Sequence, residues 1–162
     1  MNDIERITAF KQAKKLYVNF LATVLWQLAD TRERFAQSMH CALFGLWRQV
    51  DKVQGPQAFK VLYRIALSAN TLAWRSPIPT APTTGDTRYT RLRQEIAQTT
   101  RKAIAELPLE QSEAVVMRYI SKRGLGDIAE SLGVSKTRAQ RRLCQAVETL
   151  KRKVGSRSPS AA

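Results

Sequence analysis

Apolar residues recur at intervals of three and four along most of the chain, and strict alternation of apolar and polar residues is nearly absent. This spacing predicts α-helices rather than strands. In the N-terminal half it indicates a long first helix, a second that begins after a cap at Asp30 or Thr31, and a third from about Pro56 to Trp74. The expected buried stripes are, in chain order, Tyr17, Leu21, Val24 and Leu28; Phe35, Met39, Ala42, Leu43 and Leu46; and Phe59, Leu62, Tyr63, Ala66 and Ala73.

The C-terminal half carries the same periodicity in four shorter segments. They are residues 90–106, 109–122, 125–132 and 136–153. Between the halves, residues 76–87 are rich in proline and threonine, and proline cannot continue a helix because it lacks an N–H and restrains its neighbour. We therefore expect an all-α protein of two small helical domains, residues 1–75 and 88–154. A flexible linker, 76–87, would join them, and a disordered tail, 155–162, would follow.

Residues 126–143 have the pattern of a helix-turn-helix. Ile128, Ala129 and Leu132 would pack a short first helix, and the small Ala129 lets a second helix approach closely. Gly133 can take the left-handed conformation that ends the first helix, and Ser135 can accept a backbone N–H at the start of the second. The C-terminal domain is thus predicted to be a helix-turn-helix domain.

The second of these helices has two chemically distinct faces. Ala139, Leu143 and Ala146 fall on one side, and arginine and glutamine side chains fall opposite them. Such side chains can donate paired hydrogen bonds to base edges, and lysine or arginine at the edges can hold phosphates. The expected DNA-binding residues are Ser135, Lys136, Thr137, Arg138, Gln140, Arg141, Arg142 and Gln145.

Charge and composition narrow the function further. The chain has 27 Lys and Arg against 13 Asp and Glu, a net charge of +14, which is typical of a protein that binds nucleic acid. With a single histidine and no Gly-rich phosphate loop, we expect neither an enzyme nor a metal or cofactor site.

The most apolar stretch, 16–29, is shorter than the roughly 20 residues of a membrane span. No secretion signal is recognisable, so we expect a cytoplasmic protein without membrane insertion.

Residues 105–153 resemble region 4 of bacterial sigma factors, most closely the small extracytoplasmic-function type. The residues that carry the resemblance are Leu107-Pro-Leu-Glu-Gln-Ser-Glu-Ala-Val-Val-Met-Arg-Tyr119, Asp127-Ile-Ala-Glu and Leu132-Gly-Val-Ser. In that family this domain reads the −35 promoter element. The resemblance implies core RNA polymerase and double-stranded promoter DNA as partners, with an anti-sigma factor as a further one.

The N-terminal half is similar to the end of sigma region 2, in Leu46-Trp47-Arg48 and Leu62-Tyr63-Arg64-Ile65-Ala66. In the family, region 2 docks on the polymerase and melts the −10 element. The resemblance implies −10-type DNA contacts at Arg48, Lys52, Lys60 and Arg64, and polymerase contacts at Arg34, Gln37 and Cys41. The last three stand where the family places acids or their neighbours, so this region 2 is divergent and should dock more weakly.

Three functions follow as alternatives. The first is an extracytoplasmic-function sigma factor that directs promoter-specific initiation. The second is a sigma-like regulator that binds DNA through the helix-turn-helix alone, without full sigma activity. The third is an RNA-binding or ribosome-associated helical protein, which would show no preference for duplex promoter DNA.

Overall fold

The computed structural model describes residues 1–82 and 87–157, with side chains up to residue 156. Residues 83–86 of the expected linker and 158–162 of the expected tail lie outside the described ranges. The described residues form helices and no strand, which confirms the all-α class. The helices are α1 (Asp3–Leu28), α2 (Arg32–Arg48), α3 (Ala58–Arg75), α4 (Arg88–Glu106), α5 (Leu109–Val115), α6 (Leu125–Leu132) and α7 (Lys136–Arg157), with the short turns η1 (Val50–Lys52), η2 (Gly55–Gln57) and η3 (Val116–Ile120).

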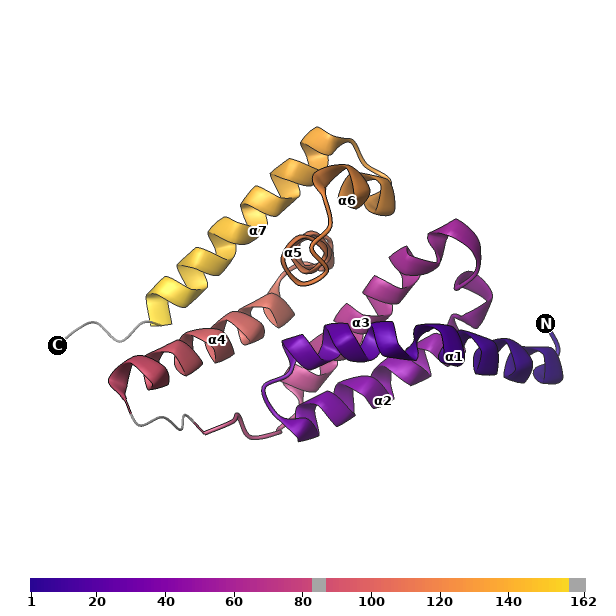
Figure 1. Cartoon of the computed structure of the whole chain (residues 1–162), viewed down its shortest axis with the longest axis horizontal. Helices are drawn as coiled ribbons and strands as arrows, with labels where there is room; N and C mark the ends of the chain where they lie inside the picture. Colours follow the sequence, from indigo (N-terminus) through magenta and orange to yellow (C-terminus); the bar gives the residue numbers. More distant parts are fainter. Residues whose placement is uncertain (83–86, 158–162) are drawn as a thin grey trace.

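The helices form two groups that meet along α3 (Figure 1). The first group is α1, α2 and α3. In the second, α4 and α7 lie alongside each other, and α5, seen end-on, lies between α7 and α3. Helix α3 contacts α1 and α2 on one side and α4, α5 and α6 on the other. One hydrophobic cluster runs through both groups, from Leu21 and Leu62 to Met117 and Leu143.

The helix ends follow from local sequence. Asn2 and Glu5 form a reciprocal capping box at the start of α1. Thr31, the second of the two expected caps, accepts a hydrogen bond from the backbone N–H of Arg34. Pro56 lies in the turn η2 rather than in α3. Helix α7 continues to Arg157, so the expectation of disorder from residue 155 is wrong for residues 155–157. A single glycine such as Gly155 does not end the helix, because it destabilises a helix by only about 1 kcal/mol.

The expected buried stripe of α2 is confirmed at Ala42 and Leu46. Phe35, Met39 and Leu43 are only half-buried at its edge, and Arg34 and Ser38 are buried in the first turns instead. Helices α2 and α3 approach closely: a Cβ added to Gly45 would lie 3.1 Å from Cγ2 of Ile65. Small residues on α2 permit this approach, and the larger aromatic and sulfur side chains are excluded from it.

Phe59, expected in the stripe of α3, is 40% exposed because it lies in the first turn of the helix, at the rim of the core. There its ring makes edge-to-face contacts with Tyr17 and Phe20 of α1.

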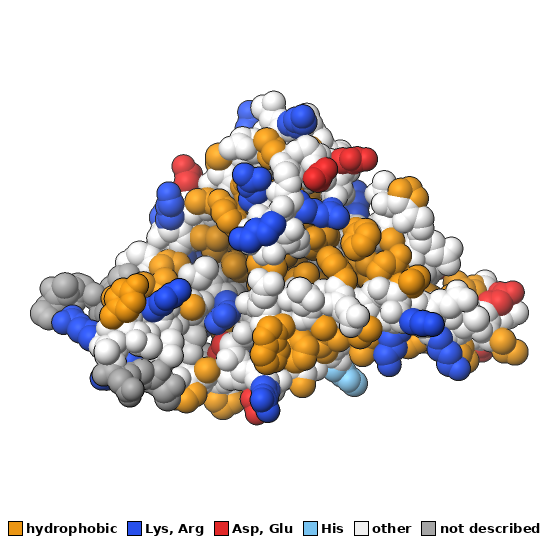
Figure 2. Space-filling view, viewed as in Figure 1, with side chains coloured by type: hydrophobic (Ala, Val, Ile, Leu, Met, Phe, Trp, Pro, Cys, Tyr) orange, Lys and Arg blue, Asp and Glu red, His pale blue; other side chains and the backbone are white. Residues whose placement is uncertain are grey.

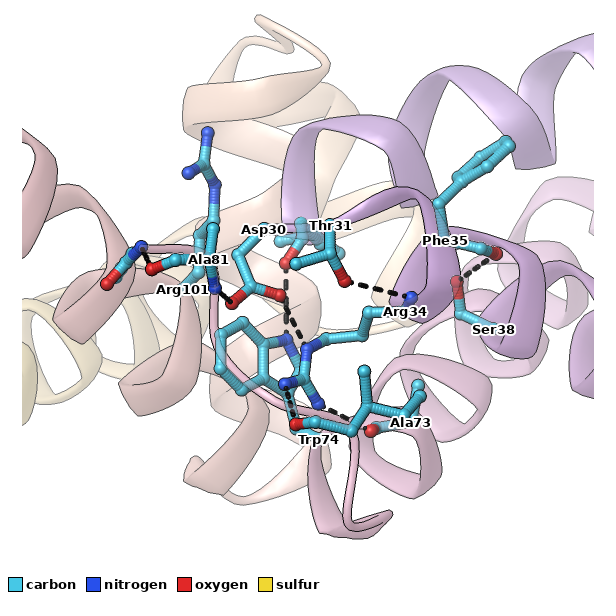
Figure 3. Close-up of polar contacts among 12 residues, drawn as sticks. Asp30, Thr31, Arg34, Phe35, Ser38, Ala73, Trp74, Ala81 and Arg101 are labelled. Carbon is cyan, nitrogen blue, oxygen red and sulfur yellow. Dashed lines mark hydrogen bonds and ion pairs between the residues drawn. The ribbon is translucent and has the colours of Figure 1, made fainter. Parts of the chain in front are cut away.

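Arg34 is the largest buried side chain and is 2% exposed (Figure 3). Its Nε lies 2.6 Å from Oδ1 of Asp30, and its guanidinium stacks on the ring of Trp74 at 4.1 Å. It also donates hydrogen bonds to the carbonyl of Ala73, at 2.7 Å, and to that of Ile78, at 2.8 Å. Arg34 therefore satisfies a carbonyl near the end of α3, where helical partners run out.

The same cluster holds the described start of the linker. The second carboxylate oxygen of Asp30 accepts the backbone N–H of Ala81, and Gln98 of α4 donates to the carbonyl of Ala81 (Figure 3). The chain after α3 is thus fixed to α2 on one side and to α4 on the other. Arg34 is not a surface contact for a partner, because each of its nitrogens is bonded inside the protein.

Polar contacts between described residues also join the two groups of helices. Arg64 pairs with Glu113, Nε to Oε1, at 2.8 Å, and Tyr63 donates a hydrogen bond to Ser121 at 2.6 Å. Thr71 donates to the carbonyl of Ala105, and Arg101 donates to that of Gln27. Together with the shared hydrophobic cluster, these contacts join the two halves that residues 76–87 separate in sequence.

Removing the buried guanidinium should destabilise the fold. Arg34→Ala leaves Asp30 buried without its ion pair, which typically costs about 3–5 kcal/mol. Arg32→Ala, on the exposed first position of the same helix, should change the free energy of unfolding by less than about 0.5 kcal/mol. Urea denaturation followed by circular dichroism measures both, and equal losses in the two variants would contradict this role for Arg34.

Glu113 should make stability depend on pH. Burial raises the pKa of Glu113 above its ordinary value of 4.5, although the hydrogen bond and charge of Arg64 oppose the shift. The unfolded chain therefore loses this proton at lower pH than the folded chain does. The contribution of this group to stability is full below the ordinary value and is lost as pH rises through the raised one.

Glu113→Gln does not titrate, so the wild-type chain should lose stability relative to this variant as pH rises from about 4 to about 7. Urea unfolding of both proteins across that range measures the difference. A difference that stays constant, or that grows in favour of the wild type, would contradict the prediction.

Candidate DNA-binding surface

The turn between α6 and α7 has the geometry that the sequence predicts. Gly133 adopts the left-handed conformation, with φ of 65°. The N–H of Val134 bonds to the carbonyl of Ala129, and that of Gly133 to the carbonyl of Glu130, the paired bonds of a Schellman motif. Ser135 then accepts the backbone N–H of Arg138 at 3.2 Å and caps α7. The turn is therefore fixed by backbone hydrogen bonds at the end of α6 and by a side-chain cap at the start of α7.

The apolar face of α7 lies inward as expected. Ala139, Leu143 and Ala146 are buried, and Val147 and Leu150 are half-buried. Ala129, 4% exposed, provides the small residue on α6 where the two helices pack. This packing sets the opposite face of α7 toward solvent.

Seven of the eight expected DNA-binding residues are exposed on that face or at its start. They are Ser135, Lys136, Thr137, Arg138, Gln140, Arg141 and Gln145. The exception is Arg142, which is half-buried and pairs with Glu110 of α5 at 3.2 Å. Its guanidinium positions α7 against α5, so a phosphate would have to compete with this carboxylate.

Lysine and arginine side chains are spread over the upper part of the view in Figure 2, where Figure 1 places α6 and the start of α7. The aliphatic part of Lys136 lies along α6, 3.4 Å from the position that a Cβ on Gly126 would occupy. Lys151 and Arg152, further along α7, are exposed. The exposed face therefore combines planar donors in its first turns with cations further along, the layout for reading bases and holding phosphates.

The four residues expected at a −10-type surface lie in two different environments. Arg48 and Lys52 are exposed near the end of α2 and in η1. Lys60 is half-buried, with Nζ 3.8 Å from where a Cβ on Gly133 would lie. Arg64 is exposed at 48% of its side chain but is bonded to Glu113. The last two thus face the C-terminal group of helices.

The three expected polymerase contacts also differ in exposure. Gln37 is exposed on α2 and Cys41 is half-buried, whereas Arg34 is enclosed by its internal partners. The resemblance to region 2 placed Arg34 on a surface that its side chain does not reach. The sequence contains no sign of this, because Ala73 and Ile78, whose carbonyls hold the guanidinium inside, lie far from Arg34 in sequence.

Sequence reasoning missed the residues that join the two halves. The guanidinium of Arg123 lies 5.6 Å from the rings of both Phe59 and Tyr63, and it donates a hydrogen bond to Ser131. Lys122, just before it, has a positive φ of 55° and turns the chain toward α6. No motif signals the contacts of Arg123 with Phe59 and Tyr63, because these residues lie far apart in sequence.

The described residues contain no group of three or more His, Cys, Asp or Glu side chains placed to hold a metal ion. None of their helices has the length and apolar character needed to cross a membrane.

No curated protein matches the chain. A family model does match its C-terminal half, in agreement with the geometry described above. Residues 94–150 match the family model described as "Sigma-70, region 4", and this range includes most of α4, all of α5 and α6, and α7 as far as Leu150. The C-terminal helices are therefore similar to sigma-70 region 4, and this similarity supports membership of the sigma-70 family.

Proposed function

We propose that this chain is an RNA polymerase sigma factor of the extracytoplasmic-function type. It binds core polymerase and directs initiation at a small set of promoters, with α7 reading the −35 element in the major groove. The observation that carries the proposal is the helix-turn-helix of a region 4 domain, whose second helix exposes Arg138, Arg141 and Gln145 opposite its buried face. The partners proposed with it are core RNA polymerase, promoter DNA and an anti-sigma factor.

A sigma-like regulator is the second candidate, and two observations favour it. The family match is confined to residues 94–150, and Arg34, one of three expected polymerase contacts, is buried. Such a protein binds DNA through α7 while its N-terminal helices serve a different partner. The RNA-binding alternative gains no support from a helix-turn-helix, which is shaped for the major groove of duplex DNA.

Run-off transcription with purified core polymerase and genomic fragments separates these candidates. A sigma factor should yield promoter-specific transcripts that depend on both the chain and core polymerase. Binding to the same fragments without core-dependent transcripts would favour the regulator. Preference for RNA over duplex DNA would overturn both.

Different residues of α7 should read bases and bind phosphates. Arg141→Ala should weaken binding at the cognate site by about 1–3 kcal/mol and relax base choice at one position. Lys151→Ala should weaken cognate and random DNA to the same extent and reduce the salt slope by about 1.

Fluorescence anisotropy with cognate and scrambled duplexes, at several salt concentrations, measures both variants. If the two substitutions lowered cognate and scrambled binding by one common factor, this division of roles would be wrong.

A further inference from the structure

Two adjoining clefts lie where the end of α1 and the start of α2 face α4. One, of about 460 Å³, runs along α4, and the other, of about 280 Å³, lies beside the end of α1. Asp30 and Arg101 line both, so the two clefts meet at these residues (Figure 3). Their size is in the range of sites for small molecules.

The wall of the larger cleft that α4 supplies is one face of that helix. The residues follow helical spacing and are Thr90, Arg93, Gln94, Ala97, Gln98 and Arg101. The chain at Ala81 and Pro82 lines the same cleft. The smaller cleft adds Trp26, Thr31 and Arg32.

Three guanidinium groups line the clefts and are free to hold an anion. Arg32 and Arg93 are exposed, and their guanidinium groups make no ion pair or hydrogen bond with other described residues. Arg101 donates from Nε to the carbonyl of Gln27 at 3.0 Å. This bond holds Arg101 at the junction of the clefts and leaves its two Nη groups unbonded within the part of the chain that the structure describes.

Asp30, the carboxylate among the described lining residues, does not cancel this charge. Its side chain is only 1% exposed, because one oxygen pairs with Arg34 and the other accepts the backbone N–H of Ala81. The lining of the clefts is therefore positively charged, and it favours an anion with several negative charges.

Trp26 is an exposed aromatic side chain in the smaller cleft. It is 57% exposed, and its ring makes an edge-to-face contact with Phe35, with the ring centroids 5.1 Å apart. This contact positions the indole while more than half of the residue remains accessible. An exposed aromatic ring of this kind can stack on a nucleobase of any type.

We propose that the two clefts form a binding site for a free nucleoside polyphosphate. The base stacks on Trp26, and the phosphates lie among Arg32, Arg93 and Arg101. Three guanidinium groups beside one aromatic ring suit several phosphates on one base, whereas a nucleic acid strand carries one phosphate for each base. The site is separate from the exposed face of α7, and the proposal does not depend on the proposed function.

Isothermal titration calorimetry with ATP, GTP, CTP and UTP tests the site. At least one of them should bind with one molecule per chain, and more tightly than its monophosphate or inorganic tripolyphosphate. Trp26→Ala should weaken this binding about tenfold through the loss of stacking, and Arg32→Ala about tenfold through the loss of a phosphate contact.

Two control variants account for the general positive charge of the chain. Phe44→Ala removes an aromatic side chain of similar exposure, 60%, and Arg91→Ala removes an exposed guanidinium of α4 that lines neither cleft. Both should keep the wild-type affinity. Trp26→Phe retains a ring, so it should keep most of the affinity while the quenching of tryptophan fluorescence by the nucleotide falls.

Failure of all four nucleotides to bind would overturn the proposal. Equal weakening in the cleft and control variants would do the same, because it would indicate attraction to the charge of the whole chain. Tripolyphosphate that binds as tightly as the nucleotide would exclude a role for the base. If Trp26→Ala loses helix content by circular dichroism, Arg32→Ala combined with Arg93→Ala replaces it, and an unchanged affinity in that double variant overturns the site.

A short mixed-sequence single strand distinguishes the free nucleotide from a nucleic acid. It should bind without displacing the nucleotide. Complete displacement, with the same dependence on Trp26 and Arg32, would assign the clefts to nucleic acid and overturn the proposal. Because none of these measurements contains polymerase or promoter DNA, a failed run-off assay leaves their results intact.

Discussion

The structure depends on the burial of α3 on two sides at once. Leu62, Ala66 and Ala73 are fully buried, and so are Tyr63 and Leu67, whereas Arg64, Ser68, Leu72 and Arg75 form an exposed stripe. A helix whose apolar face is this wide needs neighbours on more than one side to cover it. Helices α1 and α2 supply one cover and α4, α5 and α6 the other, and the single hydrophobic cluster is the result.

The interior also contains a charged side chain, that of Arg34. The Arg34 guanidinium lies in the interior because Asp30, two carbonyls and the face of Trp74 replace the water that it loses. A buried cation is costly without such partners, so its position is specified by all of them together. The cluster also fixes the chain that leaves α3 and directs it toward α4. Arg34, which was expected to contact polymerase, thus stabilises the fold instead.

The exposed face of α7 and the contact between the halves are separate features of the molecule. The first follows from the packing of Ala139, Leu143 and Ala146 and remains open to a duplex. The second involves Lys60 and Arg64, which face the C-terminal helices. The exposed face of α7 is therefore accessible to a duplex in this arrangement, and its accessibility does not depend on the contact between the halves.

The sequence by itself determined the features that arise within a few residues of one another. Helical periodicity, the cap at Thr31, the left-handed Gly133 and the two faces of α7 are all set by neighbours within about two helical turns. Tertiary structure decided the burial of Arg34 and Ser38 on α2. It also decided the pairing of Arg64 with Glu113 and of Arg142 with Glu110. Each depends on partners brought together only by packing, because periodicity states which face of a helix is apolar but not which side chain, or which charge, will lie against it.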